Sequence, residues 1–203
     1  MEKSLKKMSD QELVGLFIAG DENAFCVLLD RYKGKIFSVI FLIVKDKEVA
    51  EDLFQDVMLK VVRLVQAGKY NEEGKFLPWV TRIARNLSID HFRKGKRVII
   101  QRENDKYDIF YNIAQSEPNA EQKTIKDENA RLVNDLIQQL PDSQKEVLIM
   151  RHYGDLSFKE IADLTQVSIN TALGRMRYAL INMRRMMGLE VEEAKYGKKI
   201  HKE

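Results

Sequence analysis

Residues 157–187 read SFKEIADLTQVSINTALGRMRYALINMRRMM, a stretch that contains two helix starts separated by a short turn. Ser157 and Glu160 have the spacing of a capping box, in which both side chains accept hydrogen bonds from the first backbone N–H groups of a helix. After a turn over residues 165–168, Ser168 is placed to cap a second, longer helix. The order of short helix, tight turn and long helix predicts a helix-turn-helix, whose second helix lies in a DNA major groove.

The second of these helices separates apolar from polar side chains. An α-helix turns by about 100° per residue, which gathers the apolar residues on one side and leaves arginines without any acid on the other. Such polar side chains suit base edges in the first turns and phosphates further along. A helical hairpin with a solvated basic face is the alternative. The apolar side comprises Ile169, Ala172, Leu173, Met176, Leu180, Met183 and Met187, and the candidate DNA-binding residues are Ser168, Asn170, Thr171, Gly174, Arg175, Arg177 and Tyr178.

Helical periodicity also dominates the rest of the chain. Glycine and proline are scarce and strand-like alternation is rare, while Ser9 and Glu12 form a further capping box at the first helix. Between residues 99 and 128 the apolar pattern weakens and acids outnumber bases, as in a linker. We therefore predict an all-α protein with two small helical domains over residues 9–98 and 129–187, a flexible acidic linker over 99–128, and a disordered tail over 188–203.

The bulk composition excludes several classes of protein. The net charge of +3 over 203 residues is too small for a chain that coats nucleic acid with its whole surface. No apolar run reaches the roughly 20 residues that span a bilayer, and the single Cys26 cannot form an internal disulfide, so we expect a soluble, cytoplasmic protein with Cys26 in its core. The dispersed His91, His152 and His201 indicate no metal site and no cofactor. Because nucleophile and phosphate-binding motifs are also missing from the sequence, we expect no enzyme.

A second basic segment lies in the first domain, where residues 79–97 read WVTRIARNLSIDHFRKGKR. On a helix its arginines gather on one side and Trp79, which we assign to the core, on another. A loop between Gly68 and Gly74 precedes it, and an aromatic side chain there suits stacking on an unpaired base. Packing of Tyr70 inside the protein is the competing interpretation. The candidate nucleic-acid-binding residues are Lys69, Tyr70, Asn71, Arg82, Arg85, Asn86, Arg93, Lys94 and Lys96.

An acidic face is predicted on the helix before this loop. Asp52, Gln55 and Asp56 lie opposite an apolar stripe that includes Leu53 and Val57. Carboxylates repel phosphate, so this face suits a basic partner protein, unless it is simply solvated.

Four segments, in this order and spacing, closely resemble the sigma-70 family, and within it the extracytoplasmic function (ECF) group. The likeness extends over about residues 13–187, and Phe54, where a smaller residue is expected, and the basic tail over 195–202 depart from it. The segments are GDENAF (20–25), AEDLFQDVMLKVV (50–62), FLPWVTRIARNLSIDHFRK (76–94) and LPDSQKEVLIMRHYGDLSFKEIADLTQVSINTALGRMRYAL (140–180).

The resemblance implies an RNA polymerase sigma factor that directs promoter-specific transcription initiation. It implies that Asp52, Gln55 and Asp56 bind the clamp helices of the largest polymerase subunit, that the loop and helix over 69–96 capture and melt the minus-10 element, and that the helix-turn-helix reads the minus-35 element. A membrane-bound anti-sigma factor is a further implied partner. The competing hypotheses are a stand-alone helix-turn-helix regulator and a protein that sequesters polymerase.

Overall fold

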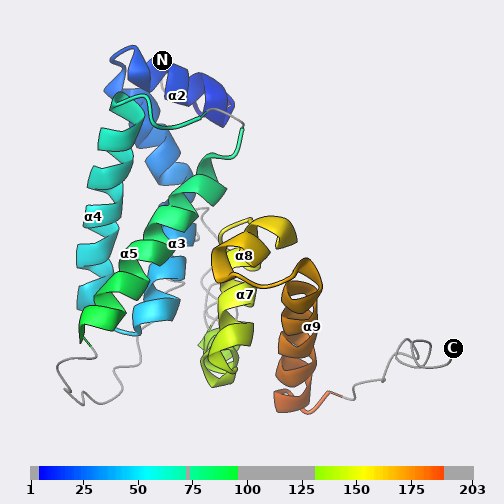
Figure 1. The fold of residues 1–203 in the computed structure, drawn as a ribbon. Helices are drawn as coiled ribbons and strands as arrows, with labels where there is room; N and C mark the ends of the chain where they lie inside the picture. The colour runs from blue at the N-terminus through cyan, green and yellow to red at the C-terminus, as the bar shows by residue number, and fades with distance from the viewer. Residues whose placement is uncertain (1–4, 72–73, 96–130, 190–203) are drawn as a thin grey trace, which may run out of the picture.

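The computed structural model describes residues 5–71, 74–95 and 131–189 (Figure 1). Every regular element in these ranges is a helix, so the predicted fold class, two all-α helical domains, is confirmed. The predicted linker and most of the predicted tail lie outside the described residues. Among the helices described, none is both long and apolar enough to cross a membrane.

Three helices of the N-terminal module begin where the sequence supplies a cap. The Ser9 side chain accepts from the Glu12 N–H at 3.3 Å, and Glu12 accepts from the Ser9 N–H at 2.8 Å, which confirms the predicted capping box. Asp21 and Asp46 cap the next two helices. The helices are α2 (Asp10–Ile18), α3 (Glu22–Val44), α4 (Lys47–Gln66) and α5 (Phe76–Gly95).

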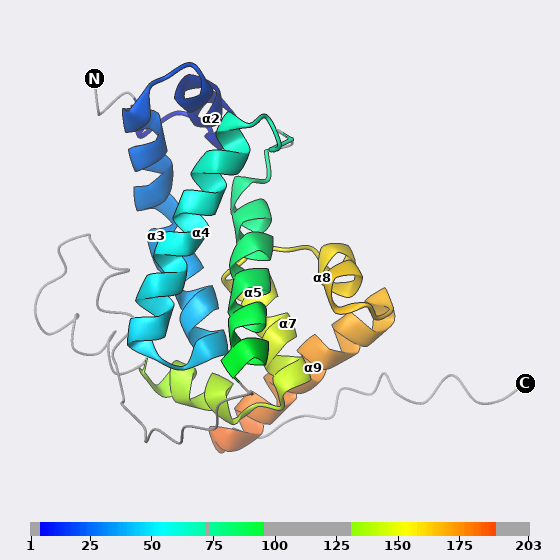
Figure 2. The same cartoon turned by 60° about the vertical axis from the view of Figure 1, so that its left-hand side comes forward.

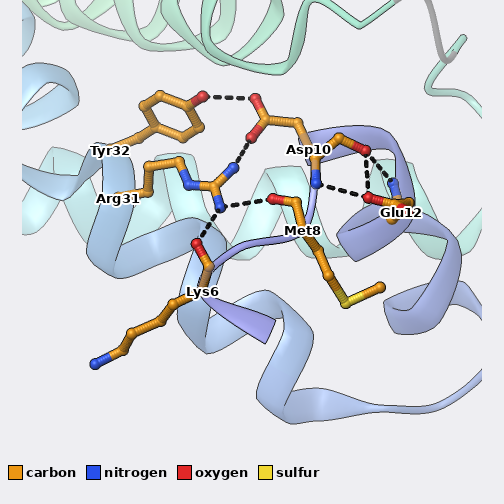
Figure 3. Close-up of polar contacts among 7 residues, drawn as sticks. Lys6, Met8, Asp10, Glu12, Arg31 and Tyr32 are labelled. Carbon is orange, nitrogen blue, oxygen red and sulfur yellow. Dashed lines mark hydrogen bonds and ion pairs between the residues drawn. The ribbon is translucent and has the colours of Figure 1, made fainter. Parts of the chain in front are cut away.

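A shared carboxylate fastens the start of α2 to α3 (Figure 3). Asp10 accepts from the Arg31 guanidinium and, at 2.6 Å, from the Tyr32 hydroxyl. Arg31 also donates to the Met8 carbonyl at 2.9 Å. Partial burial of Tyr32, together with its bond to the Asp10 carboxylate, raises the pKa of Tyr32 to about 12.

The C-terminal module is also built from helices. Residues 131–139 are helical, and they are followed by α7 (Asp142–His152), α8 (Phe158–Thr165) and α9 (Ile169–Met186). The module has a small buried cluster of its own around Met150, Leu156 and Ile161. Part of its apolar core is therefore formed by its own residues alone.

The two modules also touch each other. Figures 1 and 2 both show α7 beside the N-terminal helices, and α7 contacts α3. A second, larger buried cluster is continuous across both modules, because Ile137, Ile149 and Tyr153 belong to the same cluster as Leu28 and Val80. This contact between modules is not visible in the sequence pattern.

Two predictions about side-chain placement need correction. Cys26 is exposed, not buried, because it lies on the same side of α3 as the exposed Asn23 and Asp30. The helices α7 and α8 cover only part of the apolar side of α9. The residues in the middle of that side are therefore packed, and those at its edges are exposed. Ala172 is buried and Met176 and Met183 partly so, whereas Ile169, Leu173, Leu180 and Met187 are exposed.

Candidate nucleic-acid interface

The helix-turn-helix forms as predicted, and local hydrogen bonds set its geometry. Ser157 and Glu160 make the capping box of α8, with the Ser157 N–H 2.8 Å from Glu160 Oε2. Gln166 adopts a left-handed conformation with φ of 55°, which turns the chain, and the Ser168 hydroxyl then accepts from the Thr171 N–H at 3.0 Å to begin α9. These bonds fix the start of α9 relative to α8.

The predicted DNA-facing residues of α9 lie together on its outer side. Ser168, Asn170, Thr171, Arg177 and Tyr178 are exposed, while Gly174 and Arg175 are partly buried. Tyr178 is the most exposed large apolar side chain among the described residues, with 60% of its surface exposed. The outer side therefore offers polar groups, arginines and an aromatic ring, a combination suited to base edges and phosphates.

Gly174 lies at a helical position where no described residue requires a glycine. A Cβ added at Gly174 meets no atom within 4 Å, and the residue lies inside a regular helix, where glycine lowers stability. The absent side chain leaves room for another molecule to approach the backbone closely. This favours a contact surface at the middle of the outer side.

Two arginines of the basic segment of α5 are paired with acids in this structure. Arg82 Nη2 donates to Glu160 Oε1 at 2.9 Å, and Arg85 Nε donates to Glu146 Oε1 at 2.9 Å. Asn86 and Arg93 are exposed. Lys94 belongs to α5, its side chain lies outside what is described, and Lys96 lies outside the described residues. The sequence places Arg82 and Arg85 on one side of a helix. Their acidic partners, Glu160 and Glu146, belong to the C-terminal module.

Glu160 therefore serves two contacts at once. Partial burial by itself would raise the pKa of Glu160, but hydrogen bonds from Ser157 and the charges of Arg82 and Lys75 outweigh burial and lower the pKa. Glu160 is consequently held as a carboxylate that closes the α8 cap and faces the basic side of α5.

The aromatic side chain of the loop before α5 is partly packed against other aromatic rings, which favours the competing interpretation of Tyr70. The ring of Tyr70 is partly buried, 4.6 Å from the ring of Trp79 and 5.9 Å from that of Phe76 between centroids. Trp79 packs against the core cluster, as predicted. Lys69 and Asn71 are exposed beside this aromatic group. The ring of Tyr70 would have to leave Trp79, or be stacked on from its open side, to meet a base.

The acidic face of α4 is open. Asp52, Gln55 and Asp56 are exposed, and the neighbouring Leu53 and Val57 are buried against α3 and α5. Neither Asp52 nor Asp56 forms an ion pair with any residue that the structure describes. The helix α4 thus presents two carboxylates to solvent, and neither is paired with a basic side chain among the described residues.

Comparison with known proteins gives this arrangement a context. Residues 28–98 match the family model described as Sigma-70 region 2, and residues 130–177 match Sigma-70, region 4. RNA polymerase sigma-H factor of Pseudomonas aeruginosa is 28% identical over 176 residues, which cover 85% of this chain and 90% of that protein. ECF RNA polymerase sigma factor SigW of Bacillus subtilis is 26% identical, with 77% of this chain and 85% of the relative covered.

Two solved structures share the fold. One is the sigma factor RpoE in complex with the anti-sigma factor NepR from Bartonella quintana, with a TM-score of 0.62 and 17% identity over 82% of this chain and 98% of that one. The other is CnrH in complex with the cytosolic domain of CnrY, with a TM-score of 0.58 and 16% identity over 88% of this chain and 97% of that one.

Proposed function

Because the chain belongs to the extracytoplasmic function group of the sigma-70 family and directs transcription initiation, we propose which of its surfaces binds each partner. The outward carboxylates of α4 bind core RNA polymerase. The loop over 69–71 and the basic side of α5 bind the minus-10 element, and the outer side of α9 binds the minus-35 element. Binding in the cytoplasm without any covalent step is sufficient for this function.

The polymerase contact is supported by charge and rigidity. Asp52, Gln55 and Asp56 lie on a single well-capped helix and point away from the core. Phosphate groups repel the two carboxylates, so this face does not suit DNA. A basic protein surface would attract them and is the suitable partner. We assign that partner to the clamp helices of the largest polymerase subunit.

The promoter contacts are supported most by the outer side of α9. This is the observation that carries the proposal: an exposed, acid-free helix side follows a shorter helix and a tight turn, with a glycine at its centre that the fold does not require. Asn170, Thr171 and Arg175 are assigned to base edges, and Arg177 and Tyr178 to phosphates. Both modules are held on the same polymerase, so the second promoter contact forms within one complex once the first is made. Two contacts that are weak alone can then give useful affinity together.

Opening of the minus-10 element needs unpaired bases to be held. Unstacking one base costs a few kcal/mol, and stacking on an aromatic ring returns about 1–3 kcal/mol per base. Tyr70 is assigned to this stacking, and Lys69, Asn71, Asn86 and Arg93 to the adjoining strand, together with Arg82, Arg85, Lys94 and Lys96.

The test is reconstitution with core RNA polymerase on a library of upstream sequences, with run-off transcript as the readout. Asp52→Arg should lose polymerase binding and transcript together, because it reverses a charge at the assigned contact. Arg175→Ala should keep polymerase and lose selectivity at one upstream position, by about 1–3 kcal/mol. Arg184→Ala, in the last turn of α9, should instead weaken binding to all sequences alike.

The control for Asp52→Arg is Asp30→Arg, which reverses an exposed acid on α3 away from the assigned face. It should leave polymerase binding unchanged. Failure of the unaltered chain to start any transcript with core polymerase would overturn the assignment as a whole. Tight, specific binding to promoter duplex without polymerase would instead favour a stand-alone regulator.

An anti-sigma factor is a further proposed partner. The two solved structures of the same fold contain sigma factors held by the anti-sigma factor NepR and by the cytosolic domain of CnrY. We propose that this chain is inhibited in a similar way, by a protein that covers one or more of the surfaces named above.

A further inference from the structure

A polar cluster at the start of α2 fixes the far end of one aromatic side chain of α3 (Figure 3). The Tyr32 hydroxyl donates to Asp10 Oδ2 at 2.6 Å, and the Arg31 guanidinium donates to the other oxygen of the same carboxylate. Arg31 also donates to the carbonyls of Met8, at 2.9 Å, and Lys6, at 3.4 Å. The segment before α2 is therefore tied to α3, and the hydroxyl end of Tyr32 has a defined position.

The hydrogen bond between Tyr32 and Asp10 is largely protected from water. The Asp10 side chain is only 15% exposed, and Tyr32 is partly buried against the core cluster. A hydrogen bond to a charged carboxylate is stronger than one between neutral groups, and partial burial strengthens it further. The backbone at Asp10 is also fixed, because the capping box of Ser9 and Glu12 forms the adjoining turn. Both partners of the bond are therefore held in place.

A series of ring contacts leads from Tyr32 to the loop before α5. The centroid of the Tyr32 ring lies 6.0 Å from that of Phe76, the first residue of α5, which is only 3% exposed. The Phe76 ring meets the Tyr70 ring edge to face, with 5.9 Å between centroids. Aromatic rings at about 4.5–7 Å attract one another in tilted and edge-to-face arrangements. The bond to Asp10 is thus connected to Tyr70 through one buried ring.

The loop that carries Tyr70 begins and ends at glycines. Gly68 and Gly74 have φ angles of 65° and 68°, a left-handed conformation that glycine adopts without strain. Residues 69 and 71, on either side of Tyr70, are exposed. The packing of Tyr70 against Phe76 and Trp79 therefore ties the centre of this loop to α5.

The hydroxyl of Tyr32 adds something that ring packing alone does not require. A phenylalanine would make the same ring contact with Phe76, whereas a partly buried tyrosine needs a hydrogen-bond partner. Polar networks of this kind can select one arrangement of the elements that they join. The bond to Asp10 accordingly selects one position for the Tyr32 ring, and with it one position for Phe76.

We propose that Asp10 and Tyr32 are positioning residues for the capture of unpaired minus-10 bases: through Phe76 they hold the Tyr70 ring where a base stacks on it. The proposal rests on the stacking role assigned to Tyr70 above. A ring that is already in place loses less conformational freedom when a base stacks on it, so binding is tighter. A hydrogen bond at the start of α2 thus contributes to promoter opening without touching DNA.

The test is a double-mutant cycle between Tyr32 and Tyr70, measured on the full chain bound to core RNA polymerase. Tyr32→Phe removes the hydroxyl and keeps the ring, whereas Tyr70→Ala removes the stacking ring. The probe is a labelled single strand taken from the non-template minus-10 region of a template that the reconstituted enzyme transcribes. Tyr32→Phe should bind this probe on the order of fivefold more weakly, as expected for the loss of one hydrogen bond. In the Tyr70→Ala background it should cause no further loss, because the two residues act in series.

Two further variants accompany the cycle. Asp10→Ala breaks the same hydrogen bond from the other end, so it should weaken probe binding as Tyr32→Phe does. Asp21→Ala is the matched control, because it removes a carboxylate that accepts from the Asn23 N–H at 3.0 Å and caps α3. This variant also loses a hydrogen bond to a carboxylate, but away from the ring contacts, and it should leave probe binding unchanged.

Fluorescence gives a second readout that does not depend on DNA. Trp79 is the only tryptophan of the chain, and its ring centroid lies 4.6 Å from that of Tyr70. In free factor, Tyr32→Phe and Asp10→Ala should shift the emission of Trp79 to longer wavelength, because a displaced Tyr70 ring exposes the indole to water. Asp21→Ala should not shift it.

Probe binding by Tyr32→Phe as tight as that of unaltered factor would overturn the proposal. An equal loss in the Tyr70→Ala background or in Asp21→Ala would also overturn it, since either result indicates a general effect on folding. Unchanged emission of Trp79 in Tyr32→Phe would do the same. Failure of the assigned function is a separate outcome, because Tyr70→Ala by itself would then leave probe binding unchanged.

Discussion

At the scale of single residues, carboxylates decide how the described helices meet. Asp10 binds Arg31 and Tyr32 and thereby joins α2 to α3, whereas Glu160 caps α8 and binds Arg82 of α5. Both acids are partly covered, which makes their bonds stronger than those of exposed pairs. Asp52 and Asp56 contrast with them, since they have no ion-pair partner among the described residues and remain available to another molecule.

Tyr32 gives the protein a pH dependence in the alkaline range. Its pKa in the folded chain is about 12, raised from 10.0, so the folded state favours the neutral phenol. Its contribution to stability is complete below about pH 10 and is lost as the pH rises through about 12. Tyr32→Phe should lower the free energy of unfolding by about 1–2 kcal/mol at neutral pH and flatten this alkaline decline.

Urea unfolding followed by circular dichroism from neutral pH to pH 11 would measure both effects. The matched control is Tyr178→Phe, because Tyr178 is 60% exposed and removal of its hydroxyl should leave stability unchanged. An equal alkaline decline in Tyr32→Phe and unaltered protein would mean that another group causes it.

At the scale of helices, the sequence predicts features that depend on neighbouring residues, such as helix caps. It does not predict contacts between residues that are far apart in the chain. The caps at Ser9, Ser157 and Ser168 were predictable because each bond lies within three residues of the chain. The apolar side of α9 includes more residues than are buried in the structure. Periodicity shows which residues of a helix are apolar, but it does not show how many of them the neighbouring helices cover. The partner of Arg82 is 78 residues away, and no local pattern contains that information.

Replacement of Gly174 in α9 should have opposite effects on stability and on promoter selectivity. Gly174→Ala should stabilise the protein by up to about 1 kcal/mol, since alanine suits a helix better and a Cβ there meets no neighbour. The same methyl should weaken selective transcription that depends on the minus-35 element, because it occupies space assigned to DNA. Thermal unfolding and run-off transcription measure the two effects.

Gly15→Ala in α2 is the matched control, because its Cβ also meets nothing within 4 Å. It should give a similar gain in stability and leave promoter selectivity unchanged. If Gly174→Ala left selectivity as high as Gly15→Ala does, the close approach of DNA to Gly174 would be wrong.

At the scale of the whole molecule, the two modules pack against each other through a buried cluster that they share. The shared cluster couples the modules, and a second, smaller cluster belongs to the C-terminal module alone. The sequence predicted two helical domains and the surfaces that each presents. Their contact could not be predicted, because it depends on which faces meet after both modules have folded.

Calorimetry should reveal this coupling. At low salt the unaltered chain should unfold in one transition whose calorimetric and van't Hoff enthalpies agree, as expected when all parts unfold together. Glu146→Gln with Glu160→Gln should broaden the transition and make the calorimetric enthalpy exceed the van't Hoff value. Two resolved transitions in the unaltered chain would show that the modules are not coupled.

The distance along the chain between Arg82 and Glu160 has a consequence for the newborn protein. On the ribosome, α5 is complete long before Glu160 is synthesised, and contacts between such distant residues form late in folding. A nascent chain consequently carries its arginines uncovered, in the midst of ribosomal RNA, until α8 has emerged. Synthesis itself thus includes an interval in which Arg82 and Arg85 lack the acidic partners they have in the folded chain, and this interval ends only when the last helices are made.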